Sequence, residues 1–259
     1  MADTGEFILG FSNEYTFCTK EGVQLSSVGY NDVRDVSISS DGKFSLACSN
    51  KNVLVNMGTS LALELEVSSE YPFGVISFEG TVACAASDAD VLVFEISEDT
   101  IDTWSYGADE IIEHLFVSIN GKKIIFSAKS EITYIDVEKR ELRPIDVGSP
   151  VLSMAATPTG DMILAATDDE LLWLDGMSVI EKVDRTGIQF LSLSEDGSIA
   201  ITGTSNTIQI INRDGTLLST YDVESSITAL DVSWNKDLLV VCTETSIYTF
   251  QLFERIHSN

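Results

Sequence analysis

The sequence predicts an all-β protein built from repeated antiparallel sheets, and three observations support this prediction. A turn of the Ser-x-Asp-Gly type recurs about every 39 residues, with its glycine at Gly42, Gly80, Gly121, Gly160 and Gly197. Short apolar runs rich in β-branched residues flank each turn and are too short for helices. Polar residues typical of turns separate these runs. A sixth copy of the turn, SWNK, has a lysine in place of the glycine.

Each repeat is predicted to contain four short strands. Apolar residues stand six, three and one positions before the Ser or Thr that opens the turn, as Ile188, Leu191 and Leu193 stand before Ser194. The runs SIAITGT, IQIIN and LLSTYDV then supply the second, third and fourth strands of that repeat. The repeat that contains Gly80 is less regular and has Tyr71, Gly74 and Ile76 at the three apolar positions.

The first and last repeats are predicted to be incomplete. The runs EFILGFSN, EYTFCT and VQLSSV match the second, third and fourth strands of a repeat, whereas the last repeat shows only its first three strands. We therefore expect seven sheets, the first and last with three strands each. Six sheets are the alternative, and a strand donated by another chain is a further option.

Four-stranded units of this length, repeated six or seven times, predict a β-propeller, in which closure protects the edges of the sheets. We expect residues 1–259 to form a single propeller domain. The turn chemistry supports this fold, because Asp can hydrogen-bond its own backbone and Gly adopts a positive φ at no steric cost. Small residues in the predicted second strands suit packing between neighbouring blades; they are Ala47, Ala85, Ala165, Ala166 and Gly203.

The repeats resemble those of WD-repeat propellers and of PQQ-type propellers. The shared features are the Ser-x-Asp-Gly turn, a second strand that ends in Ser or Thr, and the third strand. The pairs Ile135-Asp136 and Leu174-Asp175 keep the acid of the Trp-Asp signature but not its tryptophan, and the Gly-His signature is absent. The stretch IQIINRDGTLLSTY looks more like PQQ-type repeats. The resemblance implies the β-propeller fold. It implies no cofactor, because the shared repeat pattern is a structural feature.

The charge balance limits the kinds of partner that we expect. The chain has 41 Asp and Glu residues against 15 Lys and Arg residues, so its formal net charge is −26. A field of this sign repels nucleic acids and anionic membrane surfaces. Solubility or adaptation to high salt would also explain such acidity. We predict a protein partner and neither nucleic-acid nor membrane binding.

The cysteines and the N-terminus favour a cytoplasmic protein. Cys18, Cys48, Cys84 and Cys242 each lie in an apolar run, which predicts buried reduced thiols. No signal peptide and no apolar stretch long enough to span a membrane is visible in the sequence.

Residues with catalytic chemistry are few, and we predict no catalytic, cofactor or metal site. The sequence contains neither a phosphate-binding glycine motif nor a GxSxG motif. Its two histidines are His114, in an apolar run, and His257, near the C-terminus. The alternative is a ligand-binding, metal-binding or catalytic propeller that uses polar residues of its first strands around a central channel; these are Arg34, Asp35, Glu113, His114 and Asp231.

The function predicted from the sequence is a non-enzymatic scaffold for protein–protein interaction, or a subunit of a larger assembly. The turns between second and third strands, and the segments that lead into the first strands, open on one face of a propeller. We expect that face to bind a partner through Asp32, Arg34, Tyr71, Asp88, Asp90, Asp109, Glu110, Asp168, Asp169, Glu170 and Arg185. Trp234, in a turn on the opposite face, is a further candidate. The other interpretation of the acidic residues is ordinary turn chemistry.

Overall fold

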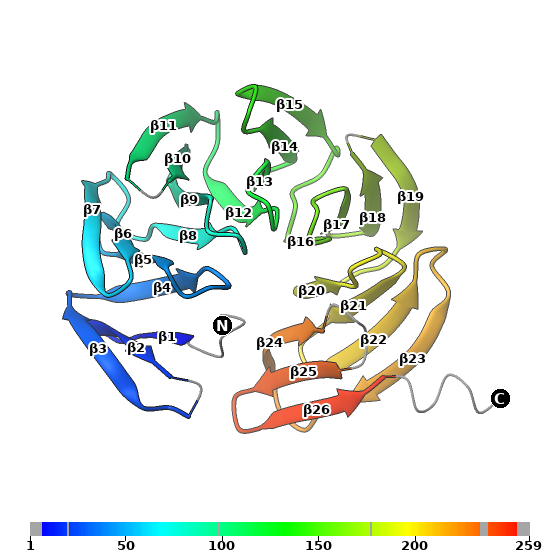
Figure 1. Ribbon diagram of the computed structural model, residues 1–259. Helices are drawn as coiled ribbons and strands as arrows, with labels where there is room; N and C mark the ends of the chain where they lie inside the picture. Colours follow the sequence, from blue (N-terminus) through cyan, green and yellow to red (C-terminus); the bar gives the residue numbers. More distant parts are fainter. Residues whose placement is uncertain (1–6, 20, 98, 177, 234–237, 253–259) are drawn as a thin grey trace. The chain divides into compact units, whose positions relative to one another are not determined.

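The computed structural model describes residues 7–19, 21–97, 99–176, 178–233 and 238–252. These residues form 26 β-strands and no helix. The chain divides into two compact units, Met1–Lys129 with Thr133–Leu142 and Ser130–Ile132 with Arg143–Asn259. In every sheet the strands pair with their neighbours in chain order, as Figure 1 shows for the individual sheets.

The first unit contains three sheets and most of a fourth. The three-stranded first sheet is formed by β1 (Phe7–Gly10), β2 (Glu14–Cys18) and β3 (Gln24–Gly29). The second sheet is formed by β4 (Val33–Ile38), β5 (Phe44–Ser49), β6 (Asn52–Met57) and β7 (Ser60–Glu66). The third is formed by β8 (Phe73–Ile76), β9 (Val82–Ser87), β10 (Asp90–Ile96) and β11 (Ile101–Gly107). The fourth is formed by β12 (Ile112–Val117), β13 (Lys123–Ala128), β14 (Glu131–Asp136) and β15 (Glu141–Asp146).

The second unit contains the remaining three sheets. One is formed by β16 (Ser153–Ala156), β17 (Met162–Ala166), β18 (Glu170–Asp175) and β19 (Ser178–Asp184). The next is formed by β20 (Phe190–Leu193), β21 (Ile199–Gly203), β22 (Thr207–Asn212) and β23 (Leu217–Asp222). The last has three strands, β24 (Ile227–Val232), β25 (Leu238–Thr243) and β26 (Ile247–Gln251). The expected seven sheets, with three strands in the first and the last, are therefore confirmed for the described residues.

The recurrent turn joins the first two strands of a sheet through one buried hydroxyl. In the turn after β20, the Ile199 N–H donates to Ser194 Oγ at 3.0 Å, and that hydroxyl donates to Asp196 Oδ1 at 2.9 Å. Gly197 has a φ of 68° and donates its N–H to the Ser194 carbonyl at 2.9 Å. The same hydroxyl-to-backbone bond recurs at Ser39, Ser77, Ser118, Thr157 and Ser233. The predicted turn chemistry is thus confirmed; Lys236, in the SWNK copy, lies outside the described residues.

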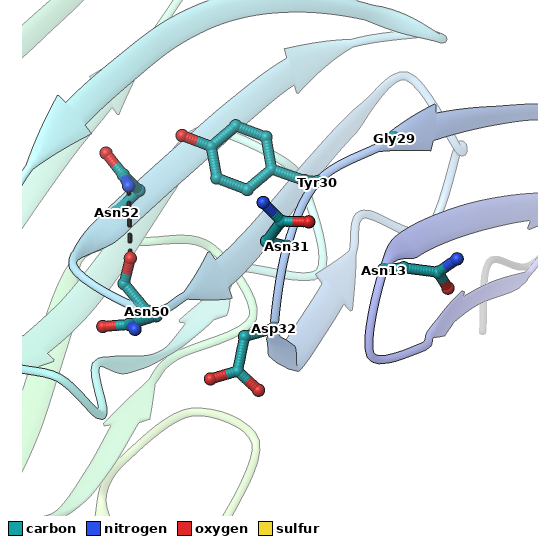
Figure 2. Close-up of a pocket in the computed structure, with 7 residues that line it drawn as sticks. All are labelled: Asn13, Gly29, Tyr30, Asn31, Asp32, Asn50 and Asn52. Atoms are coloured by element: carbon teal, nitrogen blue, oxygen red, sulfur yellow. Dashed lines mark hydrogen bonds between the residues drawn. The ribbon is translucent and has the colours of Figure 1, made fainter.

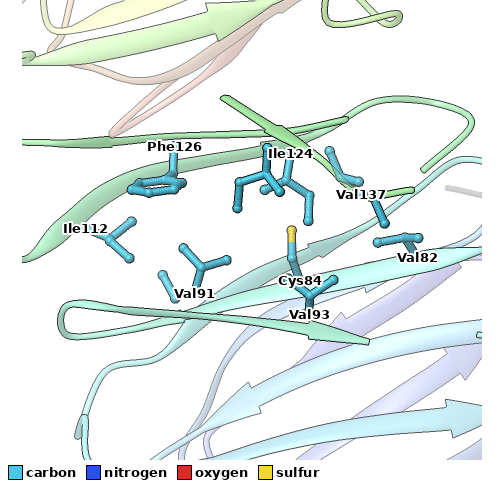
Figure 3. Packing of buried hydrophobic residues seen from close by; sticks show 11 residues of the cluster. Val82, Cys84, Val91, Val93, Ile112, Ile124, Phe126 and Val137 are labelled. Atoms are coloured by element: carbon cyan, nitrogen blue, oxygen red, sulfur yellow. The ribbon is translucent and has the colours of Figure 1, made fainter. Parts of the chain in front are cut away.

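Apolar side chains of successive sheets interlock to form the core. Figure 3 shows Val82, Cys84, Val91 and Val93 of the third sheet facing residues of the fourth, among them Ile124 and Phe126. Burial raises the pKa of the Cys84 thiol well above its usual value, so this cysteine acts as a small apolar residue. All four cysteines are free, and only Cys242 is not fully buried.

Small residues allow the sheets to approach one another closely within each unit. A Cβ on Gly203 would lie 2.6 Å from Leu230 of the next sheet, and one on Gly197 would lie 2.9 Å from Met162 of the preceding sheet. The turn glycines therefore have two roles, because they adopt a positive φ and also leave room for the neighbouring turn.

Replacement of Gly197 by alanine is expected to lower the free energy of unfolding by about 2 kcal/mol or more, because it combines left-handed strain with overpacking. The matched control is Gly148→Ala, since Gly148 has a φ of 87° and nothing within 4 Å of an added Cβ. We expect the control to lower the free energy of unfolding by about 1 kcal/mol, because it adds only the left-handed backbone strain. Urea unfolding measures both values, and equal costs would contradict the packing role.

Candidate functional site

Two of the polar first-strand residues, Asp35 and Asp231, join neighbouring sheets. The Gly74 N–H donates to Asp35 Oδ2 at 2.8 Å, and Ser192 Oγ donates to Asp231 Oδ1 at 2.8 Å. His114 Nδ1 lies 2.8 Å from Ser127 Oγ of the adjacent strand. Within the described part of the chain, no group of three or more His, Cys, Asp or Glu residues is placed to hold a metal ion. Asp35 and Asp231 therefore have a clear structural role in joining the sheets.

Tyr71 departs from the repeat at a position where the other sheets bury an apolar residue. The corresponding residues are all at most 7% exposed; they are Val33, Ile112, Val151, Ile188 and Ile227. Tyr71 is instead 61% exposed, while the following Pro72 is buried. The Tyr71 N–H donates to Ser69 Oγ at 3.1 Å, which fixes the backbone just before β8.

Arg34 and Asp32 lie beside this exposed ring. The guanidinium carbon of Arg34 is 4.3 Å from the centre of the Tyr71 ring, and Arg34 Nη2 is 2.8 Å from Asp32 Oδ2. The hydrogen bond to Asp32 is the main reason why the pKa of Arg34 is raised. Glu70 adds a carboxylate that lies 4.0 Å from Lys51 Nζ. We refer to Asp32, Arg34, Glu70 and Tyr71 as the Tyr71 surface.

A polar cavity of about 610 Å³ adjoins this surface through Asp32. It is lined by Asn13, Gly29, Tyr30, Asn31, Asp32, Asn50 and Asn52, and we call it the asparagine pocket. Figure 2 shows the Asn31 side chain between Asn13 on one side and Asn50 and Asn52 on the other. The lining comes from three connections of the first unit, namely β1–β2, β3–β4 and β5–β6.

Tyr30 is anchored at the edge of this pocket by its hydroxyl, which donates to Glu64 Oε1. Partial burial, together with the bond to the Glu64 carboxylate, raises the pKa of Tyr30 from 10.0 to about 12. Both effects favour the neutral phenol over the phenolate.

The other predicted residues of the first unit lie around the β9–β10 turn and the segment before β12, which two backbone hydrogen bonds join. The Ala108 N–H donates to the Ala89 carbonyl at 2.6 Å, and the Ile112 N–H donates to the Asp88 carbonyl at 2.8 Å. Asp88, with a φ of 52°, accepts a hydrogen bond from Ser68 Oγ at 3.2 Å, and Glu110 pairs with Lys129 at 3.0 Å. Asp90 and Asp109 are exposed, the former at the start of β10. Among the predicted residues of the first unit, the side-chain contacts join Asp32, Arg34 and Tyr71.

Of the predicted residues of the second unit, Asp169 contacts Arg185 through the backbone. The Arg185 N–H donates to the Asp169 carbonyl at 3.0 Å, and its guanidinium reaches the Gly215 carbonyl at 3.5 Å. Glu170 pairs with Lys182 at 3.1 Å, while Asp168 and Asp169 are exposed. Trp234 lies outside the described residues. A single binding face that joins these residues to those of the first unit stays a prediction.

The sequence analysis did not identify the asparagine pocket. Asn13, Asn31 and Asn50 stand in three separate connections, where asparagine is expected for turn chemistry alone. The available signal was the recurrence of asparagine at successive connections of the first two repeats. Trp104 Nε1 donates to Glu95 Oε1 at 2.7 Å, and the indole ring lies under the Arg140 guanidinium.

Comparison with solved structures identifies the fold as a β-propeller. No protein-family model matches the chain, and no curated protein matches it in sequence. The β-propeller domain of Cps50 (Swd1) from Myceliophteria thermophila is similar with a TM-score of 0.73 at 14% identity, over 96% of this chain and 93% of that chain. Hydrazine synthase from Kuenenia stuttgartiensis is similar with a TM-score of 0.71 at 13% identity, over 97% of this chain and 94% of that chain. The chain is a β-propeller, and its described sheets are seven blades.

Among the described residues, no helix is long and apolar enough to cross a membrane.

Substitution of Tyr30 by phenylalanine is expected to flatten the alkaline stability profile. The raised pKa means that Tyr30 stabilises the fold fully below pH 10.0, and that this contribution is lost as the pH rises towards 12. Ultraviolet titration should show one tyrosine fewer ionising near pH 12 in the variant than in the native protein. A native protein whose Tyr30 ionises near pH 10.0 would contradict the burial and the bond to Glu64.

Proposed function

We propose that the protein is a non-enzymatic β-propeller that binds a protein partner through the Tyr71 surface, as a scaffold or as a subunit of an assembly. The exposure of Tyr71 is the observation that carries this proposal. Five equivalent positions of the repeat hold buried aliphatic residues, so packing of the fold does not require an exposed aromatic ring there. Tyrosine and arginine are among the residues that contribute most to binding at protein interfaces.

The arrangement of the Tyr71 surface suits recognition. Arg34 is held from two sides, by the ring of Tyr71 at 4.3 Å and by the carboxylate of Asp32 at 2.8 Å. A side chain that is already ordered loses less conformational entropy when a partner binds. The surface is therefore pre-organised, with an apolar ring at its centre and charged groups around it.

The charge of the protein favours a cationic partner surface. A net charge of −26 attracts positively charged proteins and accelerates their association at low salt. The same field opposes binding to nucleic acids and to anionic membranes. The free cysteines support the proposal that the protein acts in the cytoplasm, where thiols stay reduced.

Fold similarity alone does not decide between binding and catalysis, because one fold hosts many activities. One of the two similar structures is named as an enzyme and the other as a propeller domain. The non-enzymatic proposal rests instead on Asp35 and Asp231, whose carboxylates are engaged in hydrogen bonds between sheets.

The test is a pull-down with the tagged protein from native lysate, followed by affinity measurement for the stoichiometric partner. Tyr71→Ala and Arg34→Ala should each weaken that affinity by about tenfold or more, as expected for central interface residues. Raising the salt concentration should slow association.

The matched control is Arg140→Ala. Arg140 also packs over an aromatic ring, that of Trp104 at 5.3 Å, and also pairs with a carboxylate, that of Glu95 at 2.9 Å. If this variant keeps the native affinity, the loss caused by Arg34→Ala is specific to the Tyr71 surface and does not follow from the removal of any exposed arginine. If charge reversal of Asp168, Asp169 and Glu170 abolishes binding while Tyr71→Ala does not, the interface lies on the second unit and our assignment is wrong.

A further inference from the structure

The asparagine pocket has a chemistry that the proposed protein interface does not require. Five polar side chains besides Tyr30 line it, and they arrive from three different connections of the first unit; they are Asn13, Asn31, Asp32, Asn50 and Asn52. Four of these five are amides, which each offer hydrogen-bond donors and an acceptor. The cavity of about 610 Å³ falls within the size range of small-molecule sites.

Most of these amides are available for a ligand. Asn52 Nδ2 donates to the backbone carbonyl of Asn50 at 3.2 Å. In the described part of the chain, the side-chain amides of Asn13, Asn31 and Asn50 form no hydrogen bond with another protein group. All three side chains are exposed to solvent, so a ligand that replaces their water has to supply both donors and acceptors.

A left-handed backbone conformation does not account for the asparagines of the β5–β6 connection. The residue with left-handed backbone there is Lys51, with a φ of 62°, and not Asn50 or Asn52. In the β3–β4 connection that conformation is taken by Asp32, with a φ of 59°. Asparagine tolerates such a conformation well, yet here it occupies neighbouring positions that do not need it.

The walls of the pocket are held in place by backbone hydrogen bonds. The Tyr30 N–H donates to the Asn13 carbonyl at 3.0 Å, and the Asp32 N–H donates to the Ser12 carbonyl at 2.5 Å. These bonds fix the β3–β4 connection against the β1–β2 turn. The connections that carry these amides are therefore held in place before any ligand arrives, which lowers the cost of binding.

The charges around the pocket select a neutral ligand. Among the described lining residues, Asp32 is the one carboxylate and is paired with Arg34 at 2.8 Å, and none is Lys or Arg. A phosphate or carboxylate ligand would find no cation of its own, and an apolar ligand would leave the amides unpaired. Hydroxyl groups match amides best, because each can donate and accept one hydrogen bond.

We propose that the asparagine pocket binds a neutral polyhydroxylated ligand, a sugar of one or two rings. Its ring hydroxyls would pair with the amides of Asn31 and Asn50, and its C–H groups would pack against the Tyr30 ring. This function is independent of protein binding by the Tyr71 surface, so either proposal can fail without the other.

The experiment is saturation-transfer NMR on the full chain with five probes: methyl α-glucoside, methyl α-mannoside, methyl β-galactoside, N-acetylglucosamine and trehalose. We expect at least one of these sugars to receive magnetisation from the protein. Asn31→Ala and Asn50→Ala should each weaken its binding by about fivefold or more, as the loss of a ligand hydrogen bond predicts. Both residues are exposed, so melting curves should confirm that the variants stay folded.

The matched control is Asn206→Ala, since Asn206 is an exposed asparagine of the corresponding turn between β21 and β22. This variant and Tyr71→Ala should bind the sugar as the native protein does. The proposal is overturned if none of the five sugars binds, or if binding survives both pocket substitutions. It is also overturned if Asn31→Ala leaves sugar binding intact but removes the protein partner, because the pocket would then receive a peptide segment.

Discussion

The hydroxyl that opens each recurrent turn is the interaction on which the rest of the structure depends. It accepts the N–H of the residue five positions on, so it fixes where the first strand ends and the second begins. That register decides which residues of both strands face the neighbouring sheet, because side chains alternate along a strand. The hydroxyl itself is fully buried at Ser39, Ser77, Ser118 and Ser194. Its partners are therefore needed to offset the cost of burying a polar group.

The Tyr71 surface and the asparagine pocket are both built on connections, outside this regular framework. The strands hold the connections at fixed distances, and the connections vary in sequence without disturbing the core. Asp32 belongs to both features, since its carboxylate pairs with Arg34 while the residue also lines the pocket. A ligand in the pocket and a partner on the surface would thus act on the same left-handed residue.

The strand order, the recurrent turns and the incomplete first and last sheets could be predicted from the sequence. The turn occurs in six copies, so each copy can be aligned with five others and shared positions stand out. The exposure of Tyr71 could not, since Tyr71 aligns with buried residues and only the structure shows Pro72 buried in its neighbourhood. The asparagine pocket also escaped prediction, because its amides come from connections that only the packing of two sheets brings together. Polarity suggested that Asp35 and Asp231 serve a ligand, whereas the structure shows them bonded to the next sheet.

The turns of the first unit are also linked to one another. The Ser40 N–H donates to the Phe78 carbonyl at 2.8 Å, and the Glu79 N–H donates to the Ile119 carbonyl at 2.9 Å. Turns are usually the first segments to open, and their amides exchange with solvent quickly. The turns at Ser39 and Ser77 are each closed by their own hydroxyl and bonded to the turn of the next sheet. Amide hydrogen exchange at Ser40 and Glu79 should consequently be slow for turn residues, because these turns open only together with the sheets they join.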